Sequence, residues 1–546
     1  MKKKIIVLLL VVAISIASFF AYRCYEENRV SELYLASDTN ELVAYDENLM
    51  ATNLVRGKKV LAKNKYQNID GQDYRHVEAD GNTYYILDSN LVENIQDCIL
   101  EDKMYVKTTS SLLEMDSANI IGLLNKGDDV DIIGYSDLLA DGSVKMYHVR
   151  HNDLEGRVYA KYLSLDLSVE DNAYLDIHKS REDLYGGGDA YSLEYTYEEK
   201  PLFEANIMPE VCNTLYINGS SIAYIDDYID FALNNNINAF VIDIKDSHIP
   251  TYQAEAMKKY SPTAYDNALM TAEEFKNQIL KAKEAGIYLI GRITVFKDTN
   301  YAIDHPEDAI FDKTENASLY YNSSYWPSAY KRNVWVYNVE LAKEVVLNYG
   351  FNEIQFDYVR FPDRIGAMES NGEIDLLNAY GETKAQAVQR FVMYAADELH
   401  SINAYISVDV FGETSNAYVT AYGQYWPAIS NYVDVISAMP YPDHFNIHDY
   451  GIEEAVWEVP YKLLDIWSKD VQVRQSETPS KAKVRTWIQG YDSIKEPYVE
   501  YDSTKIKEQI EALYDNGLSD GFIVWNGASS LEKYRSFSEA FNSLDD

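Results

Sequence analysis

The sequence has few cysteines and few basic residues for its length. Only Cys24, Cys98 and Cys212 occur among 546 residues, too few for a disulfide framework in so long a chain. The formal net charge is −39 and the pI is about 4.5. Proteins that bind nucleic acids need a basic face to neutralise phosphates, so we expect no nucleic-acid partner. Stability must come from packing of the apolar residues, which make up 47% of the chain.

Several motifs of cofactor-dependent and metal-dependent enzymes are also missing. No glycine-rich βα turn offers a phosphate site, and NGSS at 218–221 does not supply one. No Gly-x-Ser-x-Gly elbow marks a serine hydrolase. His444 and His448 are four residues apart, but PDHFNIHDY is typical of a loop, and no H-E-x-x-H motif or cysteine pair accompanies them. We therefore expect neither a cofactor nor a metal.

An apolar segment follows the lysines at positions 2–4. The uncharged run over residues 5–22 is about 18 residues long, close to the minimum for a membrane span. The positive flank stays inside, which places the rest of the chain outside the cytoplasm. No A-x-A cleavage site follows the run, so residues 1–28 are predicted to be an uncleaved signal anchor. This predicts a single-pass cell-membrane protein, or a secreted one if the segment is cleaved.

Short strands separated by turn residues are predicted before residue 167. KGDDVDII (126–133) and GRVYAKYLS (156–164) match the Gly-Asp-x-Val strand and the terminal Gly-x-Val-x-x-x-Tyr-Leu of bacterial SH3-like domains. Residues 101–166 resemble that family, and residues 29–97 resemble it more weakly. The resemblance implies binding to peptidoglycan or other wall components. A purely spacing role is the alternative.

Residues 167–205 are predicted to be an acidic linker. They include three consecutive glycines at 186–188 and carry no sustained apolar period. We expect a mobile or loosely packed connection.

The rest of the chain repeats one unit, a helix followed by a stop and a buried strand. TAEEFKNQILKAKEAGIYLIGRI begins with a capping box of Thr271 and Glu274, and Gly286 ends the helix before the strand. Gly350 ends the predicted helix in a later copy of this helix–strand unit. This βα alternation predicts a parallel sheet.

Eight such strands are predicted in the second half of the chain. They centre on 215–218, 239–243, 288–292, 353–357, 405–409, 433–439, 484–489 and 521–525. Eight units fit a (β/α)8 TIM barrel over residues 206–546, and an open doubly wound sheet is the alternative. The predicted fold class is α/β: a TIM barrel preceded by one or two small all-β SH3-like domains and a membrane anchor helix.

A carboxylate ends the apolar run of IQFDYVRFPD (354–363). Catalytic residues of such barrels lie where strands end, and parity selects the inward face of a strand. Asp357 and Asp409 share that parity on neighbouring strands, and Glu413 follows in the loop. Glycoside hydrolysis needs two carboxylates, at about 5 Å for retention or roughly 6.5–9.5 Å for inversion. We predict Asp357 as one catalytic residue, with Asp409 and Glu413 competing for the acid/base role.

Side chains near the other strand ends are candidates for substrate binding. Aromatic rings can stack on sugar faces, and cationic groups can hold hydroxyls or keep an aspartate ionised. The candidates are Asp243, Lys245, Arg292, Tyr358, Arg360, Tyr441, His444, Trp487, Gln489, Trp525 and Asn526. Structural ion pairs, Asp243 with Lys245 and Asp357 with Arg360, are the alternative.

FNEIQFDYVRFP (351–362) looks like the signature of a bacterial family of glycoside-hydrolase-like TIM-barrel proteins, named from fold and motif more than from assay. Other motifs of that family follow in order. They are NAFVIDIKD (238–246), GRITVFKD (291–298), WVYNVELAKE (335–344), ISVDVFGE (406–413), ISAMPYPDHF (436–445), VRTWIQGY (484–491) and GFIVWN (521–526). The resemblance runs from about residue 205 to the C-terminus. It implies an exported, membrane-attached or wall-associated barrel that acts on a polysaccharide.

The chain departs from the family pattern at two strands. The strand-six motif usually reads Pro-Met-x-Tyr-Pro-Ser-His-Tyr, and here it is AMPYPDHF (438–445). The strand-seven motif usually begins Arg-Pro-Trp-Leu-Gln and often continues with Asp, where this chain has Gly490. Asp492 could substitute for that acid.

These observations predict a glycoside hydrolase acting on an extracellular or cell-wall polysaccharide, such as peptidoglycan. Two alternatives stay open. One is a carbohydrate-binding barrel that has lost catalysis. The other is an envelope protein whose SH3-like modules do the binding.

Overall fold

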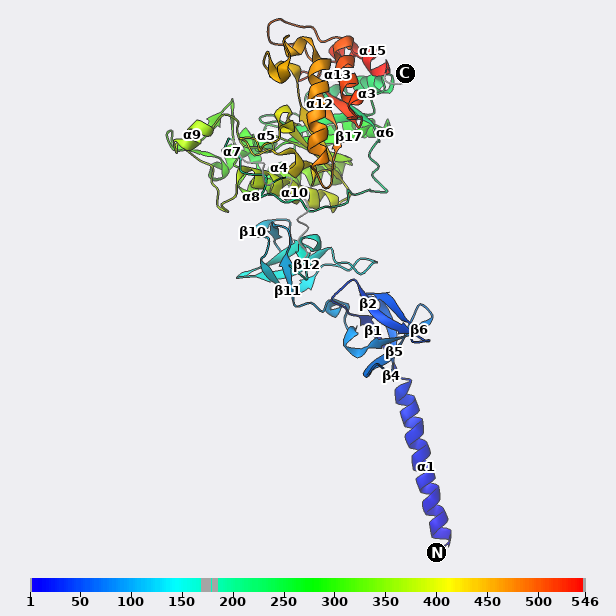
Figure 1. Cartoon of the computed structure of the whole chain (residues 1–546). Coiled ribbons are helices and arrows are strands. Elements are labelled where there is room, and N and C mark those ends of the chain that lie inside the picture. The colour runs from blue at the N-terminus through cyan, green and yellow to red at the C-terminus, as the bar shows by residue number, and fades with distance from the viewer. Residues whose placement is uncertain (1, 168–177, 179–184, 544–546) are drawn as a thin grey trace. The chain divides into compact units, whose positions relative to one another are not determined.

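The computed structural model describes residues 2–167, 178 and 185–543. They form two compact units. The first runs to residue 170 apart from 118–120, and the second holds the remainder. In Figure 1 the first unit is blue to cyan and the second is mostly green to red.

The chain begins with the helix α1, Lys2–Glu27. An 18-residue window within Lys3–Glu27 has a mean hydropathy of 2.8, and none of that window is buried against the described residues. By length and composition it could cross a membrane, and a signal sequence would pass the same test.

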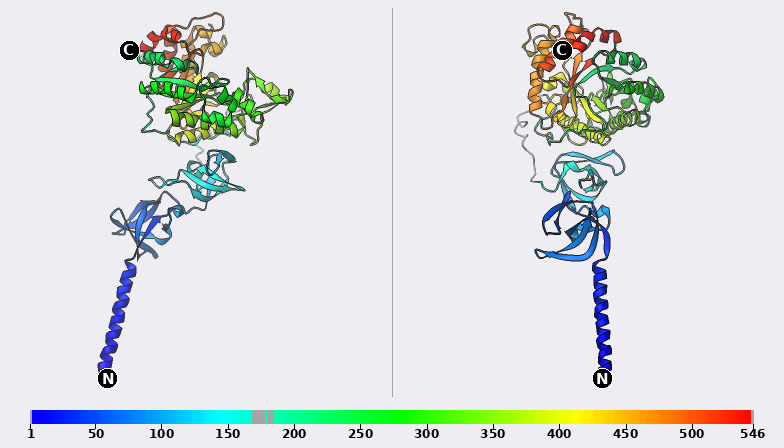
Figure 2. Two further views of the ribbon diagram at one scale, coloured as in Figure 1. Left: turned by 180° about the vertical axis from the view of Figure 1, so that it is seen from behind. Right: turned by 90° about the vertical axis from the view of Figure 1, so that its right-hand side faces the viewer.

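Two antiparallel sheets with the same strand order follow α1 in the first unit (Figures 1 and 2). The first has the order β3-β2-β6-β5-β4-β1-β7 and the second β10-β9-β13-β12-β11-β8-β14. When seven is subtracted from each strand number of the second sheet, the strand order of the first sheet results. The two sheets therefore share one topology. The strands are β1 Val30–Leu35, β2 Glu41–Asp46, β3 Ala51–Val55, β4 Lys59–Ile69, β5 Gln72–Ala79, β6 Asn82–Leu87, β7 Leu91–Val92, β8 Lys103–Val106, β9 Ser110–Leu113, β10 Ile120–Leu124, β11 Asp129–Tyr135, β12 Met146–His151, β13 Leu154–Tyr159 and β14 Leu163–Ser164.

The second unit is built on a nine-stranded parallel sheet that nearly closes on itself. Its order is β26-β25-β24-β22-β17-β16-β15-β28-β27. The two end strands β26 and β27 are separated by Arg485 alone, whose N–H donates to Ile436 O of β25 at 3.1 Å. The strands are β15 Cys212–Ile217, β16 Ala239–Lys245, β17 Tyr288–Thr294, β22 Glu353–Asp357, β24 Tyr405–Phe411, β25 Val435–Met439, β26 Lys483–Val484, β27 Thr486–Gln489 and β28 Gly521–Trp525. All eight predicted strand regions therefore form strands, and the seventh is split in two.

Helices follow the strands in alternation and cover the outside of this sheet (Figure 2, right). The predicted capping box of Thr271 and Glu274 is present at the start of α6, and Gly350 ends α8 with φ +73°. Glycine tolerates that left-handed conformation. The helices are α3 Ile225–Leu233, α4 Glu255–Tyr260, α5 Pro262–Asp266, α6 Ala272–Glu284, α7 Thr299–Asp304, α8 Arg332–Tyr349, α9 Gly366–Ser370, α10 Lys384–His400, α11 Trp426–Ser430, α12 Pro460–Ser476, α13 Ser503–Asp515, α14 Leu531–Arg535 and α15 Ser538–Asn542.

Long loops after β17 and β22 meet in a small sheet of their own. Strand β18 (Phe311–Asp312) lies between β19 (Ala317–Ser318) and β23 (Ile374–Asp375). The hairpin of β20 (Tyr320–Tyr321) and β21 (Ser324–Tyr325) accompanies them. Trp326 and Ile365 belong to the apolar cluster under this sheet, and Tyr358 packs against it. The loop carrying Tyr358 is thus held by a core separate from the barrel interior.

Residues 187–195 of the predicted linker are closely packed. Ala190, Leu193 and Tyr195 are buried in one cluster with residues of α10 and α11. A side chain at Gly187 would meet Thr420 O at 1.9 Å, so glycine is required there by close packing. The expectation of a loose connection is wrong for residues 187–195. Residues 196–205 include no buried side chain, and residues 168–177 and 179–184 lie outside the described residues.

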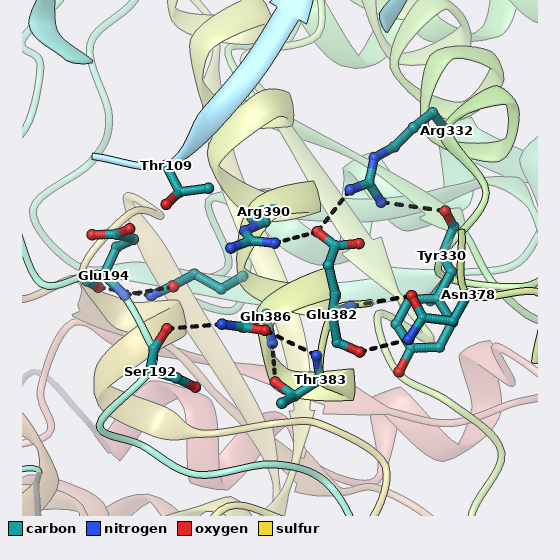
Figure 3. Close-up of polar contacts among 12 residues, drawn as sticks. Thr109, Ser192, Glu194, Tyr330, Arg332, Asn378, Glu382, Thr383, Gln386 and Arg390 are labelled. Atoms are coloured by element: carbon teal, nitrogen blue, oxygen red, sulfur yellow. Dashed lines mark hydrogen bonds and ion pairs between the residues drawn. The ribbon is translucent and has the colours of Figure 1, made fainter. Parts of the chain in front are cut away.

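A buried ion triad fixes the far end of the loop after β22. Glu382 Oε1 accepts from Arg332 Nη2 at 2.7 Å and from Arg390 Nη1 at 2.5 Å (Figure 3). The guanidinium of Arg332 lies 3.9 Å from the centre of the Trp335 ring and 4.4 Å from that of Tyr380. One carboxylate therefore compensates two enclosed cations.

Replacing Glu382 by glutamine is expected to lower the free energy of unfolding by about 3 kcal/mol, because two buried cations lose their anion. All seven tryptophans lie in the second unit, so tryptophan fluorescence during urea unfolding measures this change. Glu284→Gln, at the exposed end of α6, is the control and should stay within about 0.5 kcal/mol. An equal effect of the two changes would contradict the role of the triad.

Candidate active site

Four charged side chains meet at the carboxyl ends of neighbouring barrel strands. Asp243 lies on β16, Arg292 on β17, Asp357 at the end of β22 and Asp409 on β24. These strands are adjacent and parallel in that order. Inward parity therefore places the four side chains in one mouth, as the sequence pattern predicts.

The Arg292 guanidinium contacts all three carboxylates. Nη1 is 2.8 Å from Asp243 Oδ1, Nη2 pairs with Asp357 Oδ2, and Nε is 3.5 Å from Asp409 Oδ2. The Asp357 side chain is 9% exposed and that of Asp409 is 0% exposed. One cation thus faces three acids in a site with little access to water. The surplus of negative charge would stabilise a bound proton or a positively charged, oxocarbenium-like transition state.

The pKa of Asp409 is raised well above its usual value by burial, and the Asp357 charge raises it further. Arg292 and the Trp487 indole, whose Nε1 donates to Asp409 Oδ1 at 2.7 Å, act in the opposite direction. The pKa of Asp243 is also raised by burial, against the effects of Arg292 and of the hydrogen bond from the Tyr216 hydroxyl. Neighbouring carboxyls in unlike environments are typical of acid/base sites.

Asp409→Asn should raise stability relative to wild type, by an amount that grows with pH. A group whose pKa is higher in the folded than in the unfolded state costs stability as pH rises from about 3.9 towards the folded value. Asparagine keeps the acceptor for Trp487 and removes this titration. Urea midpoints of both proteins from about pH 4 to about pH 7, read by tryptophan fluorescence, measure the difference. A difference that shrinks as pH rises would contradict the raised pKa of Asp409.

The residue after Asp357 has an uncommon backbone. Tyr358 has φ +51°, a conformation that costs energy for a bulky side chain. Its N–H donates to Asp357 Oδ1 at 2.6 Å, which helps to fix the carboxylate. Arg360 pairs instead with Asp363 at 3.3 Å, so a pairing of Asp357 with Arg360 is wrong.

Lys245 is buried and engaged elsewhere. Its Nζ pairs with Asp298 and donates to Thr294 O at 2.6 Å. Burial lowers the pKa of Lys245, and Asp298 works against that shift. The alternative of an ion pair between Asp243 and Lys245 is therefore wrong. The pairing of β16 with β17 shifts register between the two residues, which breaks the alternation of faces, and each side chain contacts a different neighbouring segment.

The aromatic side chains at the mouth differ in their exposure. Trp487 and Tyr441 are 0% and 3% exposed, so neither ring offers a face on which a sugar could stack, contrary to the sequence-based expectation. Trp525 is partly exposed and lies 4.4 Å from the Tyr216 ring and 5.6 Å from the Trp487 ring. Of these three candidates, Trp525 retains an accessible surface.

Three polar residues near strands seven and eight hold loops. Gln489 Oε1 accepts from Asp443 N at 3.1 Å, and Asn526 Nδ2 donates to Gly490 O at 2.7 Å. Asp492, considered as a substitute acid, is exposed and pairs with Lys533 at 2.7 Å. These contacts give all three a structural role. The acids of the mouth are therefore those of strands two, four and five: Asp243, Asp357 and Asp409.

A cleft of about 750 Å³ opens beside the mouth. Glu413 and His444 line it and are exposed. Met439 also lines it and packs against the core cluster that contains Trp487, so cleft and mouth are neighbours. The Tyr422 hydroxyl donates to Glu413 Oε1. The acid of strand five and the acid of the turn that follows it are thus separated: Asp409 is enclosed beside Arg292, and Glu413 faces the open cleft.

One group of side chains in the described part of the chain has the spacing of metal ligands. His305, Glu307 and Asp308 place donor atoms within 4.8 Å of one another. His305 Nε2 is 2.8 Å from Tyr260 O, and Asp308 Oδ2 accepts from the Tyr301 hydroxyl at 3.0 Å. His305 Nδ1 lies 3.3 Å from Glu307 Oε1 within the group. None of the three residues belongs to the mouth cluster.

Sequence reasoning missed two partners of the charged cluster. Tyr216 bonds Asp243, and Asp298 pairs with Lys245. Tyr216 lies inside the first predicted strand with inward parity, so the parity rule applied to that strand would have found it. Asp298 caps α7, and its role depends on how the loop folds back, which no local pattern shows.

Comparison with known proteins gives a family match. A sequence model of the family described as "Putative glycosyl hydrolase domain" matches residues 214–531. No curated protein matches the chain.

Three solved structures are similar to this chain at low sequence identity. A hypothetical protein from Ruminiclostridium thermocellum is 27% identical, over 36% of this chain and 97% of that one, with a TM-score of 0.30. The glycoside hydrolase domain of PgaB (BpsB) from Bordetella bronchiseptica is 11% identical, over 61% and 98%, with a TM-score of 0.42. A class V chitinase from Pseudomonas fluorescens is 13% identical, over 62% and 100%, with a TM-score of 0.39.

The family match covers more than half of the chain and includes every barrel strand except the first residues of β15. This protein therefore belongs to the family described as "Putative glycosyl hydrolase domain".

Proposed function

We propose that this protein is a glycoside hydrolase whose active site is the mouth of the parallel barrel. The observation that carries the proposal is the meeting of Asp357 and Asp409, from the adjacent strands β22 and β24, on the single guanidinium of Arg292. Two nearby carboxylates in unlike environments are what hydrolysis of a glycosidic bond requires.

Asp357 is the carboxylate that attacks the anomeric carbon or activates water. It is the most exposed acid of the cluster, and Arg292 together with the Tyr358 N–H fixes its orientation. The proton donor to the leaving oxygen is Asp409 or Glu413. Asp409 has the raised pKa expected of an acid, whereas Glu413 faces the cleft in which a polymer would lie.

The architecture supports action outside the cytoplasm. We interpret β26 and β27 as one strand interrupted at Arg485, which leaves the eight strand positions of a TIM barrel. The two sheets of equal topology are SH3-like modules (residues 29–97 and 101–166) that bind or span wall material. Helix α1 serves as a signal anchor, and the barrel of residues 206–546 acts on an extracellular or wall polysaccharide.

A barrel that binds glycans without cleaving them is the second candidate. The enclosure of Asp409 and the absence of an acid at Gly490 favour it.

The test is the release of reducing ends by the full-length protein, held in detergent micelles, from a panel of bacterial wall, plant and host polysaccharides. Release from at least one polymer is expected. Binding to a polymer in the panel without release would favour the second candidate. If the protein neither binds nor cleaves any polymer of the panel, the result would count against both candidate functions.

A further inference from the structure

The open cleft beside the mouth receives one aromatic side chain from outside the family-matched domain. Tyr185 lines this cleft and is 58% exposed. It precedes residue 214, where the family match begins, and it belongs to the same compact unit as the barrel. The segment before the barrel therefore supplies part of the wall of the cleft.

The backbone that follows Tyr185 is attached to the barrel helix α10. Gly187 O accepts a hydrogen bond from Ala385 N at 2.9 Å. A Cβ atom at Gly188 would lie 2.5 Å from the Thr383 side chain, and Thr383 is the N-cap of α10. These close contacts keep the segment against the barrel and place Tyr185 at the edge of the cleft.

Tyr185 forms an aromatic corner with Tyr418, which also lines the cleft and is partly exposed. The two ring centres are 5.5 Å apart, and the ring planes make an angle of 66°. Such an edge-to-face arrangement is favourable for an aromatic pair. Asn416 Nδ2 donates to the Tyr418 hydroxyl at 3.1 Å, which helps to fix the second ring. More than half of the Tyr185 side chain still faces solvent.

The aromatic corner and the acid Glu413 belong to the same cleft. Tyr418 and Glu413 both follow β24 in the chain, and the Tyr422 hydroxyl donates to Glu413 from the same loop. All three side chains line the cleft of about 750 Å³. Ligand pockets commonly have volumes of about 300–1,000 Å³, so the cleft can hold a ligand that contacts both the acid and the aromatic corner.

The charges of the cleft disfavour an acidic polymer. Four carboxylates line it, against one arginine, one lysine and one histidine: Asp363, Glu413, Asp443, Asp449, Arg364, Lys495 and His444. Like charges that face each other across an interface cost free energy. Sugars that carry carboxylate or phosphate groups would meet this excess of negative charge, whereas uncharged sugars would not.

We infer that Tyr185 and Tyr418 bind one ring of an uncharged polysaccharide whose ring substituents are equatorial. The axial C–H bonds of such a ring form apolar faces that suit an exposed aromatic surface, while its hydroxyl groups stay in water. This inference rests on the proposed function and deepens it by naming a substrate-binding residue and a substrate class. A sugar held at the aromatic corner adds binding energy away from the mouth, so long chains bind better than single sugars.

Isothermal titration calorimetry with two defined hexasaccharides tests the aromatic corner. The probes are the hexamers of β-1,4-linked glucose and of β-1,4-linked N-acetylglucosamine, whose ring substituents are equatorial. Full-length protein in detergent micelles is used, and every sample carries Asp357→Asn so that no ligand is cleaved. At least one hexamer should bind, and adding Tyr185→Ala should weaken its affinity about threefold to tenfold. Failure of both hexamers to bind, or an unchanged affinity after Tyr185→Ala, would overturn the inference.

Two further variants separate stacking from a structural role. Tyr185→Phe keeps the ring, so its affinity should stay within about twofold of the parent protein. Tyr191→Ala changes a tyrosine of the same segment that is 56% exposed and lies outside the cleft lining, and it should alter neither the affinity nor the urea midpoint. A lower urea midpoint for Tyr185→Ala with unchanged hexamer affinity would show that Tyr185 only supports the fold.

The inference and the proposed function fail in distinguishable ways. On a polymer that wild type cleaves, Tyr185→Ala alone should raise the Michaelis constant about threefold to tenfold and leave the turnover number within about twofold. Hexamer binding that depends on Tyr185, without cleavage of any polymer by wild type, would keep the aromatic corner and remove the hydrolase. Cleavage with an unchanged Michaelis constant in Tyr185→Ala would keep the hydrolase and remove the aromatic corner.

Discussion

Asp357→Asn should reduce the turnover number on a cleaved polysaccharide by at least about 10³-fold. Asparagine is nearly isosteric and can keep the hydrogen bond from the Tyr358 N–H, but it can neither attack the anomeric carbon nor take a proton from water. The Michaelis constant should change little because the cleft and its aromatic corner are untouched. Initial rates of reducing-end release over a range of substrate concentrations separate the two parameters.

Asp227→Asn is the matched control, since Asp227 is an exposed aspartate on α3. Its rate should equal that of wild type. If Asp357→Asn retained full turnover while binding normally, the catalytic residue would lie elsewhere, and the mouth would be a binding site only.

Arg292→Met should lower the free energy of unfolding of the barrel by about 3–5 kcal/mol and abolish turnover. The change leaves the carboxylates of Asp243, Asp357 and Asp409 close together without their cation, and breaking a buried pair costs that much. The loss should be largest at neutral pH and smaller at about pH 4, because protonation of the acids relieves their repulsion. Urea unfolding followed by tryptophan fluorescence at both pH values measures it.

Arg292→Lys separates charge from geometry. Lysine restores a positive charge but cannot reach three carboxylates with a planar fork, so we expect part of the stability to return and little of the activity. Arg364→Met, at an arginine whose side chain is 89% exposed, should have no comparable effect on the free energy of unfolding. A neutral-pH loss for Arg292→Met as small as that for Arg364→Met would contradict the role of the guanidinium as the centre of the cluster.

The barrel strands could be predicted because each signal was local. Capping at Thr271, a glycine stop at Gly350 and continuous apolar runs mark βα units without reference to the rest of the chain. The break at Arg485 could not be predicted in this way. Its side chain crosses the barrel to Glu353 Oε1 at 2.9 Å. Glu353 lies on β22, more than a hundred residues earlier in the chain, so no local pattern around Arg485 indicates this pair.

The charged residues of the mouth and Tyr216 could be found from inward parity, but the way in which their side chains pair could not. Asp243 and Lys245 are two positions apart on one strand, but a register shift between them breaks the alternation of faces, and each side chain pairs with a different partner. Pairing is decided by reach across adjacent strands, which a sequence does not display. Burial was equally hidden: Trp487 lies within β27, close to the predicted mouth, but its side chain is 0% exposed.

The three glycines at 186–188 could not be interpreted from the sequence alone. A run of glycines is compatible with a flexible linker or with a close approach of two backbones, and composition alone cannot separate them. Here Gly187 lies against Thr420 O and its neighbours join the cluster around α10. The long-range contact that decides the question involves residues far apart in the chain.

The most direct test of the account is a crystal structure of Asp357→Asn with an oligosaccharide taken from the polymer that wild type cleaves best. The account predicts a sugar bound across the mouth and the adjoining cleft, with a glycosidic oxygen or anomeric carbon within hydrogen-bonding or attack distance of residue 357. A sugar bound only on the β-sheet modules, or on the barrel away from residue 357, would contradict the claim that this mouth is the active site of a glycoside hydrolase.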